Sequence, residues 1–140
     1  MVNLTDDMRA QLVQAATEAR ENAYAPYSKF KVGAAVLGTD GKIYKGCNIE
    51  NVSYGLTNCA ERTAIFKMVS EGCCKFVAIA VTAGENATDG APCGACRQVM
   101  CEFAQDLNTT AVILCGSEDG EIYETVASLC PYPFVSFKED

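Results

Sequence analysis

The sequence of residues 76–82 is Phe-Val-Ala-Ile-Ala-Val-Thr, a nearly unbroken apolar run. A run of this length without polar alternation is typical of a strand buried on both faces of a sheet. Segments with helical patterns flank it, at residues 58–71 and 93–107. Asn58 can cap the first of these helices, and Gly72 follows its end. A buried strand between two helices indicates an α/β domain.

The patterns outside this central stretch complete the element order. Apolar residues recur at helical spacing over residues 4–23, and Thr5 or Asn3 can cap that helix. The C-terminal Leu129-Cys-Pro-Tyr-Pro-Phe134 contains two prolines, which exclude a central strand there. Further strands are predicted at residues 30–37, 43–48, 111–115 and 122–126. This order predicts a layered domain with one mixed sheet.

Length and composition exclude several classes of protein. The 140 residues correspond to one domain, residues 1–140, and 49% of them are hydrophobic. No apolar run approaches the roughly 18 residues of a membrane span. The acidic start lacks the basic region of a signal peptide, so we expect a cytoplasmic protein, with the nucleus as an alternative. A net charge of −7 repels phosphate backbones and disfavours nucleic-acid binding.

The chain contains no histidine and nine cysteines. The lack of histidine excludes Ser-His-Asp triads, Cys-His proteases and histidine-ligated metals. An odd number of cysteines without an export signal favours thiols or metal ligands over a disulfide framework.

Three of the cysteines, Cys59, Cys93 and Cys96, lie at the starts of predicted helices. Helices that follow adjacent parallel strands begin at the same edge of a sheet, so the three sulfurs can converge. Helix N-termini lower thiol pKa values and favour the thiolates that zinc binds. Three cysteines leave one tetrahedral position free, as in catalytic zinc sites. Glu61, two residues after Cys59, can then act on the attacking water.

Cys-x-Glu followed by Pro-Cys-x-x-Cys is the signature of zinc nucleobase deaminases. The wider sequence resembles the small homotetrameric cytidine deaminases over nearly the whole chain. One departure is Cys130, where that family commonly has leucine, and Pro133 is also unusual. The matching segments are Phe30-Lys-Val-Gly-Ala-Ala35, Cys47-Asn-Ile-Glu-Asn51, Cys59-Ala-Glu-Arg-Thr-Ala64, Pro92-Cys-Gly-Ala-Cys-Arg-Gln98 and the ending at Phe134.

The resemblance implies a three-layer α/β/α cytidine-deaminase-like fold, with one mixed sheet of about five strands and helices on both faces. It implies a hydrolase that acts on the C–N bond of a cyclic amidine. Cytidine and 2′-deoxycytidine would be converted to uridine and 2′-deoxyuridine with release of ammonia, in pyrimidine salvage. One zinc ion per chain would be held by Cys59, Cys93 and Cys96, and Glu61 would transfer the protons.

Two arginines share helix faces with the predicted ligands. Arg62 lies three residues after Cys59, and Arg97 lies four residues after Cys93. Both are expected to donate hydrogen bonds to the sulfurs and to offset the thiolate charge. The alternative for each is a solvated surface arginine.

The resemblance also implies how a nucleoside would be held. Phe30 would pack on the base, and Asn48 with Glu50 would bind the ribose 3′-hydroxyl. Asn48 and Glu50 are two residues apart in an extended stretch, so their side chains can point the same way. Turn formation by Asn48 is the alternative reading of that residue. The complete set of predicted substrate-binding residues is Phe30, Asn48, Glu50, Tyr54, Ala60 and Phe134.

In the family, Tyr54 and Phe134 reach into a neighbour's site, which implies a homotetramer with shared active sites.

A polynucleotide cytosine deaminase is a competing hypothesis, disfavoured by the acidic net charge and the lack of basic-aromatic stretches. A deaminase of nucleoside antibiotics would share the zinc motif, but Phe30 and the Asn48/Glu50 pair favour cytidine. A thiol redox protein with a Cys-x-x-Cys motif is another competing hypothesis, but it leaves Cys59 and Glu61 unexplained. A structural zinc module lacks a fourth ligand.

Overall fold

The computed structural model describes residues 4–117 and 120–137, and they contain one five-stranded sheet with the order β2-β1-β3-β4-β5. Only the pair β3–β4 is parallel, with Ile79 opposite Val112, and the remaining pairs are antiparallel. The sheet is therefore mixed, as predicted. The strands are β1 (Val32–Gly38), β2 (Ile43–Cys47), β3 (Phe76–Ala83), β4 (Ala111–Cys115) and β5 (Glu121–Thr125).

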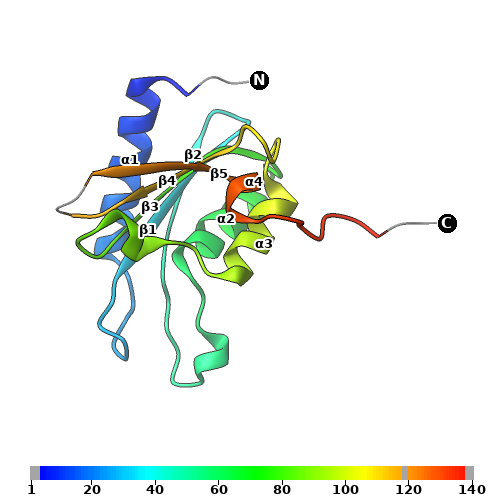
Figure 1. Cartoon of the computed structure of the whole chain (residues 1–140). Helices are drawn as coiled ribbons and strands as arrows, with labels where there is room; N and C mark the ends of the chain where they lie inside the picture. Colours follow the sequence, from blue (N-terminus) through cyan, green and yellow to red (C-terminus); the bar gives the residue numbers. More distant parts are fainter. Residues whose placement is uncertain (1–3, 118–119, 138–140) are drawn as a thin grey trace.

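Helices cover both faces of this sheet (Figure 1). One hydrophobic cluster joins α1 to one face of the central strands, and a second joins α2, α3 and α4 to the other. Consecutive strand residues such as Val36 and Leu37 belong to different clusters because side chains alternate across a strand. The three-layer fold is confirmed. The helices are α1 (Asp6–Glu21), α2 (Ala60–Ser70), α3 (Gly94–Phe103) and α4 (Val126–Leu129), with 3-10 turns η1 (Tyr54–Leu56) and η2 (Ala87–Gly90).

Two glycines let helices approach the hairpin β1–β2 closely. A Cβ atom at Gly33 would lie 2.0 Å from the backbone oxygen of Ala16 in α1. A Cβ atom at Gly46 would lie 2.4 Å from the backbone nitrogen of Ala64 in α2. Neither backbone atom can move aside cheaply, so these positions admit only glycine. The close packing of α2 on β2 sets the position of the residues at the start of α2.

The element boundaries differ from prediction mainly at the helix ends. Thr5 caps α1 as expected, since its Oγ1 accepts a hydrogen bond from Met8 N at 3.1 Å. Cys59, rather than Asn58, is the N-cap of α2. Helix α3 ends at Phe103, short of residue 107, because the following chain turns to pair with β3: Gln105 N donates to Phe76 O at 2.9 Å.

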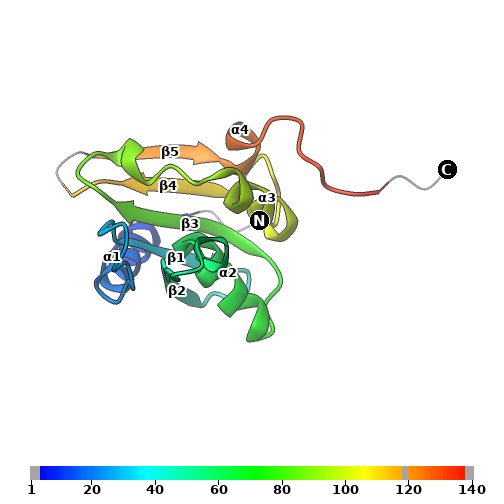
Figure 2. The ribbon, with the colours of Figure 1, turned by 90° about the horizontal axis from the view of Figure 1, so that it is seen from below.

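The single turn of α4 was not predicted, since its sequence gives no helical periodicity over so few residues. The segment after α4 leaves the body of the protein beside α3, as Figures 1 and 2 show from two directions. It forms no strand in its described part, residues 130–137, in agreement with the prediction from its prolines. None of the helices formed by residues 4–117 and 120–137 is long and apolar enough to cross a membrane.

Candidate metal centre and active site

The structure brings the sulfurs of Cys59, Cys93 and Cys96 together. They all lie within 4.8 Å of one another, and the Sγ atoms of Cys59 and Cys93 are 3.9 Å apart. Zinc–sulfur bonds of about 2.3 Å at tetrahedral angles place two sulfurs about 3.8 Å apart. The donor set and spacing therefore fit a tetrahedral zinc ion with three protein ligands. Within the described residues, this is the one group of at least three cysteine or acidic side chains with that spacing.

The helix ends explain this convergence. Cys59 is the N-cap of α2, Cys93 is the N-cap of α3, and Cys96 lies in the first turn of α3. The strands that lead into these helices are β2 and β3, which run in the same direction but have β1 between them. The prediction of adjacent parallel strands is therefore wrong. The helices still begin at one edge of the sheet, because two antiparallel steps restore the strand direction.

The thiolate form of Cys59 is favoured at this site. A hydrogen bond from the Cys96 thiol, followed by the nearby Arg62 guanidinium, lowers the pKa of Cys59 to about 5. Arg62 Nη2 donates to Cys59 Sγ at 3.3 Å, at the predicted position. The pKa of Cys96 is raised, because its proton is held by Cys59 and because the residue is buried. The cationic arginine would compensate the negative charge of three thiolates around a bound zinc ion.

Glu61 lies in the first turn of α2 and is only 4% exposed. Burial is the main cause that raises the pKa of its carboxyl group to about 7. A carboxyl group with a pKa near neutrality can both accept and release a proton during a reaction. Its position beside Cys59 therefore provides an acid–base group at the metal centre.

A cavity of about 190 Å³ opens over this centre. Phe30, which is 41% exposed, lies in its wall together with Ala60 and Glu61.

The η2 turn supplies lining residues that were not predicted from the sequence, Asp89 among them. The Asp89 carboxylate accepts hydrogen bonds from the backbone nitrogens of Glu85 and Asn86, at 3.0 and 2.9 Å, and holds this turn in place. The Asp-Gly pair just before the Pro-Cys motif was the available signal. The lining residues are Phe30, Val32, Asn48, Thr57, Asn58, Cys59, Ala60, Glu61, Asp89, Gly90, Ala91 and Cys93.

The structure places Asn48 and Glu50 at two different cavities. Asn48 lines the cavity over the metal centre, whereas Glu50 lines a neighbouring one of about 370 Å³, and Thr57 contributes to both. Both side chains are engaged by one segment of backbone, residues 27–32. Asn48 Oδ1 accepts from Val32 N at 2.9 Å, and its Nδ2 donates to Phe30 O at 2.8 Å.

Glu50 is held by the loop before β1. Its Oε1 accepts hydrogen bonds from Tyr27 N at 3.0 Å and Ser28 N at 3.1 Å, and its Oε2 accepts from the Ser28 hydroxyl. These bonds to Ser28 are the main cause of the lowered pKa of Glu50. Asn48 and Glu50 therefore shape the loops around the two cavities.

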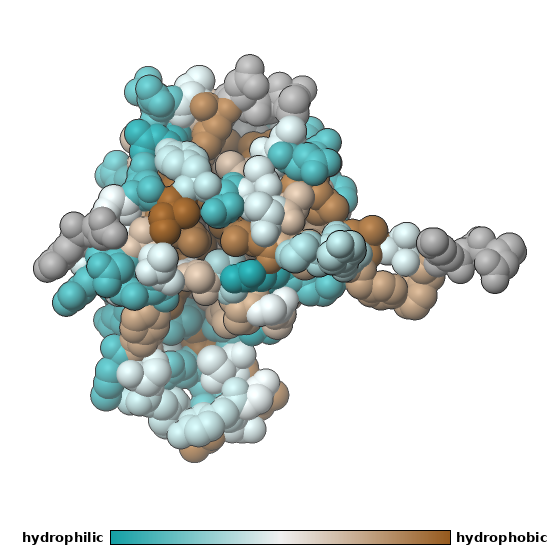
Figure 3. All heavy atoms as spheres, in the orientation of Figure 1, coloured by the Kyte–Doolittle hydropathy of each residue, from teal (hydrophilic) through white to brown (hydrophobic). Residues whose placement is uncertain are grey.

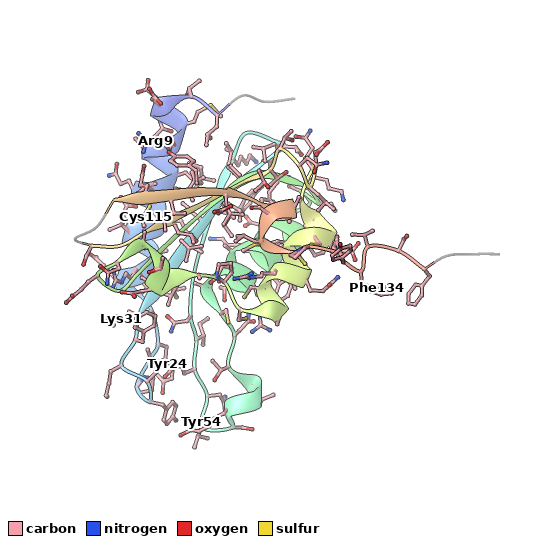
Figure 4. All side chains as sticks on the ribbon, in the orientation of Figure 1. Arg9, Tyr24, Lys31, Tyr54, Cys115 and Phe134 are labelled. Carbon is pink, nitrogen blue, oxygen red and sulfur yellow. The ribbon has the colours of Figure 1, made fainter. Side chains whose placement is uncertain are left out.

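Tyr54 and Phe134 lie on two different segments (Figure 4), and neither lines the cavity over the metal centre of its own chain. Tyr54 is 75% exposed on η1, where its ring packs edge-on to Tyr27 with centroids 6.1 Å apart. Phe134 is 61% exposed on the C-terminal segment and packs against Phe137 with centroids 5.3 Å apart. Figure 3 shows apolar surface along this projecting segment. The structure thus does not place either ring in the cavity over Glu61.

The structure also differs from the prediction for Arg97. Its Nε donates to Pro92 O and its Nη1 donates to Leu129 O, both at 2.8 Å, rather than to a sulfur. Leu129 is the last residue of α4, and carbonyl groups at a helix C-terminus lack partners within the helix, whereas Pro92 lies outside α3, before its N-cap. Arg97 therefore contacts the loop that carries Cys93 instead of the ligand atom itself.

Comparison with known proteins matches this geometry to one family. The cytidine and deoxycytidylate deaminase zinc-binding region matches residues 7–113. The chain belongs to the cytidine and deoxycytidylate deaminase family. The family predicted from the sequence motifs is confirmed.

Individual relatives extend the similarity over most of the chain. A cytidine deaminase from Sporosarcina psychrophila is 53% identical over 133 residues, covering 93% of this chain and 92% of the relative. One from Halalkalibacterium halodurans is 54% identical over 129 residues, covering 91% and 95%. The crystal structure of cytidine deaminase from Burkholderia pseudomallei superposes with a TM-score of 0.81 at 48% identity, covering 89% of this chain and 98% of that chain.

Proposed function

We propose that the chain catalyses the zinc-dependent hydrolytic deamination of cytidine and 2′-deoxycytidine to uridine and 2′-deoxyuridine, with release of ammonia, in pyrimidine salvage. The observation that carries this proposal is the convergence of three cysteine sulfurs with the buried Glu61 at one cavity. Relatives named cytidine deaminase, more than half identical over nine-tenths of the chain, support the same reaction.

Cys59, Cys93 and Cys96 would hold one zinc ion per chain, with Arg62 donating to the Cys59 sulfur. When bound there, zinc supplies Lewis-acid activation of water at neutral pH. A zinc ion with three thiolates would carry a net negative charge, which weakens it as a Lewis acid, and the guanidinium of Arg62 would oppose that effect.

Glu61 would carry the protons of the reaction. Its carboxylate would accept a proton from the water that attacks C4 of the base and deliver it to N3 of the ring. A further proton transfer to the amino group at C4 would let it leave as ammonia. The pKa of about 7 suits both directions of transfer, because neither protonation state is strongly disfavoured near neutral pH.

The walls of the cavity suit a flat base with a sugar attached. Phe30 would pack on the ring, and the backbone at Ala60 would bind its polar edge. Asn48 and Glu50 would bind the ribose 3′-hydroxyl from their two cavities, for which the shared wall at Thr57 is supporting evidence.

A second chain would complete the site. Tyr54 and Phe134 are exposed aromatic residues on projecting segments, and such residues together mark an interaction surface. We place both in a neighbour's cavity within a homotetramer. The proposed compartment is the cytoplasm, where reducing conditions keep zinc thiolates intact.

Two measurements test this function. Purified protein should contain about one zinc ion per chain, and the ultraviolet spectrum of cytidine should change to that of uridine in the presence of the enzyme. Cytosine and CMP serve as matched substrates that lack the sugar or add a phosphate, and we expect cytidine to react fastest. Zinc-free protein that interconverts a dithiol and a disulfide at Cys93 and Cys96 would instead support the redox alternative.

A further inference from the structure

Helix α3 contacts the metal centre with its first turn and the C-terminal segment with the next residues. Cys93 caps the helix and Cys96 lies in its first turn, whereas Arg97 and Gln98 reach the chain after β5. Gln98 Nε2 donates to Phe134 O at 2.7 Å. One turn of α3 therefore joins the cysteine cluster to the C-terminal segment.

Arg97 is the side chain that touches both regions. Its Nε donates to the carbonyl oxygen of Pro92, the residue before Cys93, and its Nη1 donates to the carbonyl oxygen of Leu129, the last residue of α4. Both bonds are 2.8 Å long, as charge-assisted hydrogen bonds commonly are. Arg97 forms no ion pair with a carboxylate within residues 4–117 and 120–137. Its guanidinium therefore acts as a bridge between two stretches of backbone.

The shape of the side chain matters for this bridge. A guanidinium presents several N–H groups in a rigid plane, so two carbonyl groups on different segments can be bound at once. A lysine keeps the positive charge but directs a single ammonium group, and it cannot hold both carbonyl groups in the same geometry. The substitution Arg97→Lys therefore separates bridging from charge.

We propose that Arg97 is a positioning residue that couples the placement of the metal-binding loop to the placement of the C-terminal segment that carries Phe134. The inference rests on the proposed zinc site of Cys59, Cys93 and Cys96. One guanidinium binds both stretches of backbone, so its replacement should loosen both. Three variants of the zinc-loaded protein separate the two effects.

The first readout is the rate at which a chelator removes zinc, and the second is amide hydrogen exchange of the peptide covering residues 130–137. Arg97→Lys should speed zinc release about tenfold, the lower end for residues that orient metal ligands, and should also speed exchange in the segment. Arg62 contacts the sulfurs of Cys59 and Cys96, so Arg62→Gln should speed zinc release alone. Gln98 donates to the C-terminal segment. Gln98→Ala should therefore speed amide exchange in residues 130–137 alone and should change the rate of zinc release less than about twofold.

Exchange in β3 serves as the reference for global unfolding, and size exclusion checks that all variants share one oligomeric state. Arg97→Gln repeats the test if Arg97→Lys does not fold. The inference is overturned if Arg97→Lys changes only one readout, or if Gln98→Ala releases zinc as fast as Arg97→Lys. Wild-type protein without zinc would instead overturn the proposed function, before any variant is compared.

Discussion

Cys59, Cys93 and Cys96 meet within one chain, whereas Tyr54 and Phe134 lie on segments that project from it. The first group, which we call the metal corner together with Glu61, is anchored to helix ends packed on the sheet. The second group, the aromatic rim, is formed by side chains that are 75% and 61% exposed. The fold of one chain therefore positions the reactive groups, whereas in the proposed homotetramer a second chain would enclose the substrate.

The largest expected effect comes from removing a ligand in the metal corner. Cys96→Ala should abolish both zinc binding and deamination, because two remaining thiolates cannot form the site. Cys101→Ala is the matched control, since Cys101 is a buried cysteine of the same helix outside the cluster. Zinc content, activity and thermal midpoint should be measured together, because a metal site also stabilises the fold. Deamination by zinc-free Cys96→Ala would show that the metal corner is not the reactive part.

The next effect separates proton transfer from metal binding. Glu61→Gln keeps the size of the side chain and should retain zinc, but it should lower kcat for cytidine by about 10²–10⁴-fold. Glu71→Gln removes an exposed carboxylate at the other end of α2 and should leave kcat unchanged. An activity of Glu61→Gln within about tenfold of wild type would remove Glu61 from the proposed role.

A smaller effect tests whether the aromatic rim belongs to a neighbour. Phe134→Ala and Glu61→Ala should each be poorly active when pure. Mixed in equal amounts in one assembly, about a quarter of the sites would combine an intact Glu61 with an intact Phe134 from another chain. Activity should therefore rise to about a quarter of the wild-type value. Mixed oligomers verified by mass spectrometry but without this rise would place Phe134 outside the neighbour's site.

The smallest effect concerns the loop that Glu50 holds. Its hydrogen bonds with Ser28 lower its pKa below the ordinary value of 4.5, so its ionised form stabilises the folded state. That contribution is present above pH 4.5 and is lost as the pH falls through the lowered pKa of the folded protein. The difference in thermal midpoint between wild type and Glu50→Gln should thus shrink between about pH 6 and about pH 3. A constant difference would contradict an electrostatic role.

Local sequence patterns were sufficient for much of the metal corner. The apolar run predicted β3 to within one residue, and the strand at Ala111–Cys115 was predicted without error. The placement of cysteines at helix starts predicted their convergence, although the prediction that the preceding strands are adjacent was wrong. These features depend on periodicity, capping and backbone direction, which are properties of neighbouring residues.

The partners of individual side chains were decided by the tertiary structure. Helical spacing placed Arg62 and Arg97 equally well near a cysteine, yet only Arg62 reaches a sulfur, and Arg97 bridges Pro92 and Leu129. Likewise, nothing in the spacing of Asn48 and Glu50 indicates that the backbone of residues 27–32 engages both side chains. Spacing along one element defines a face, but the acceptor opposite that face comes from a distant part of the chain. The insertion of β1 between β2 and β3 has the same origin, because strand order depends on long-range packing.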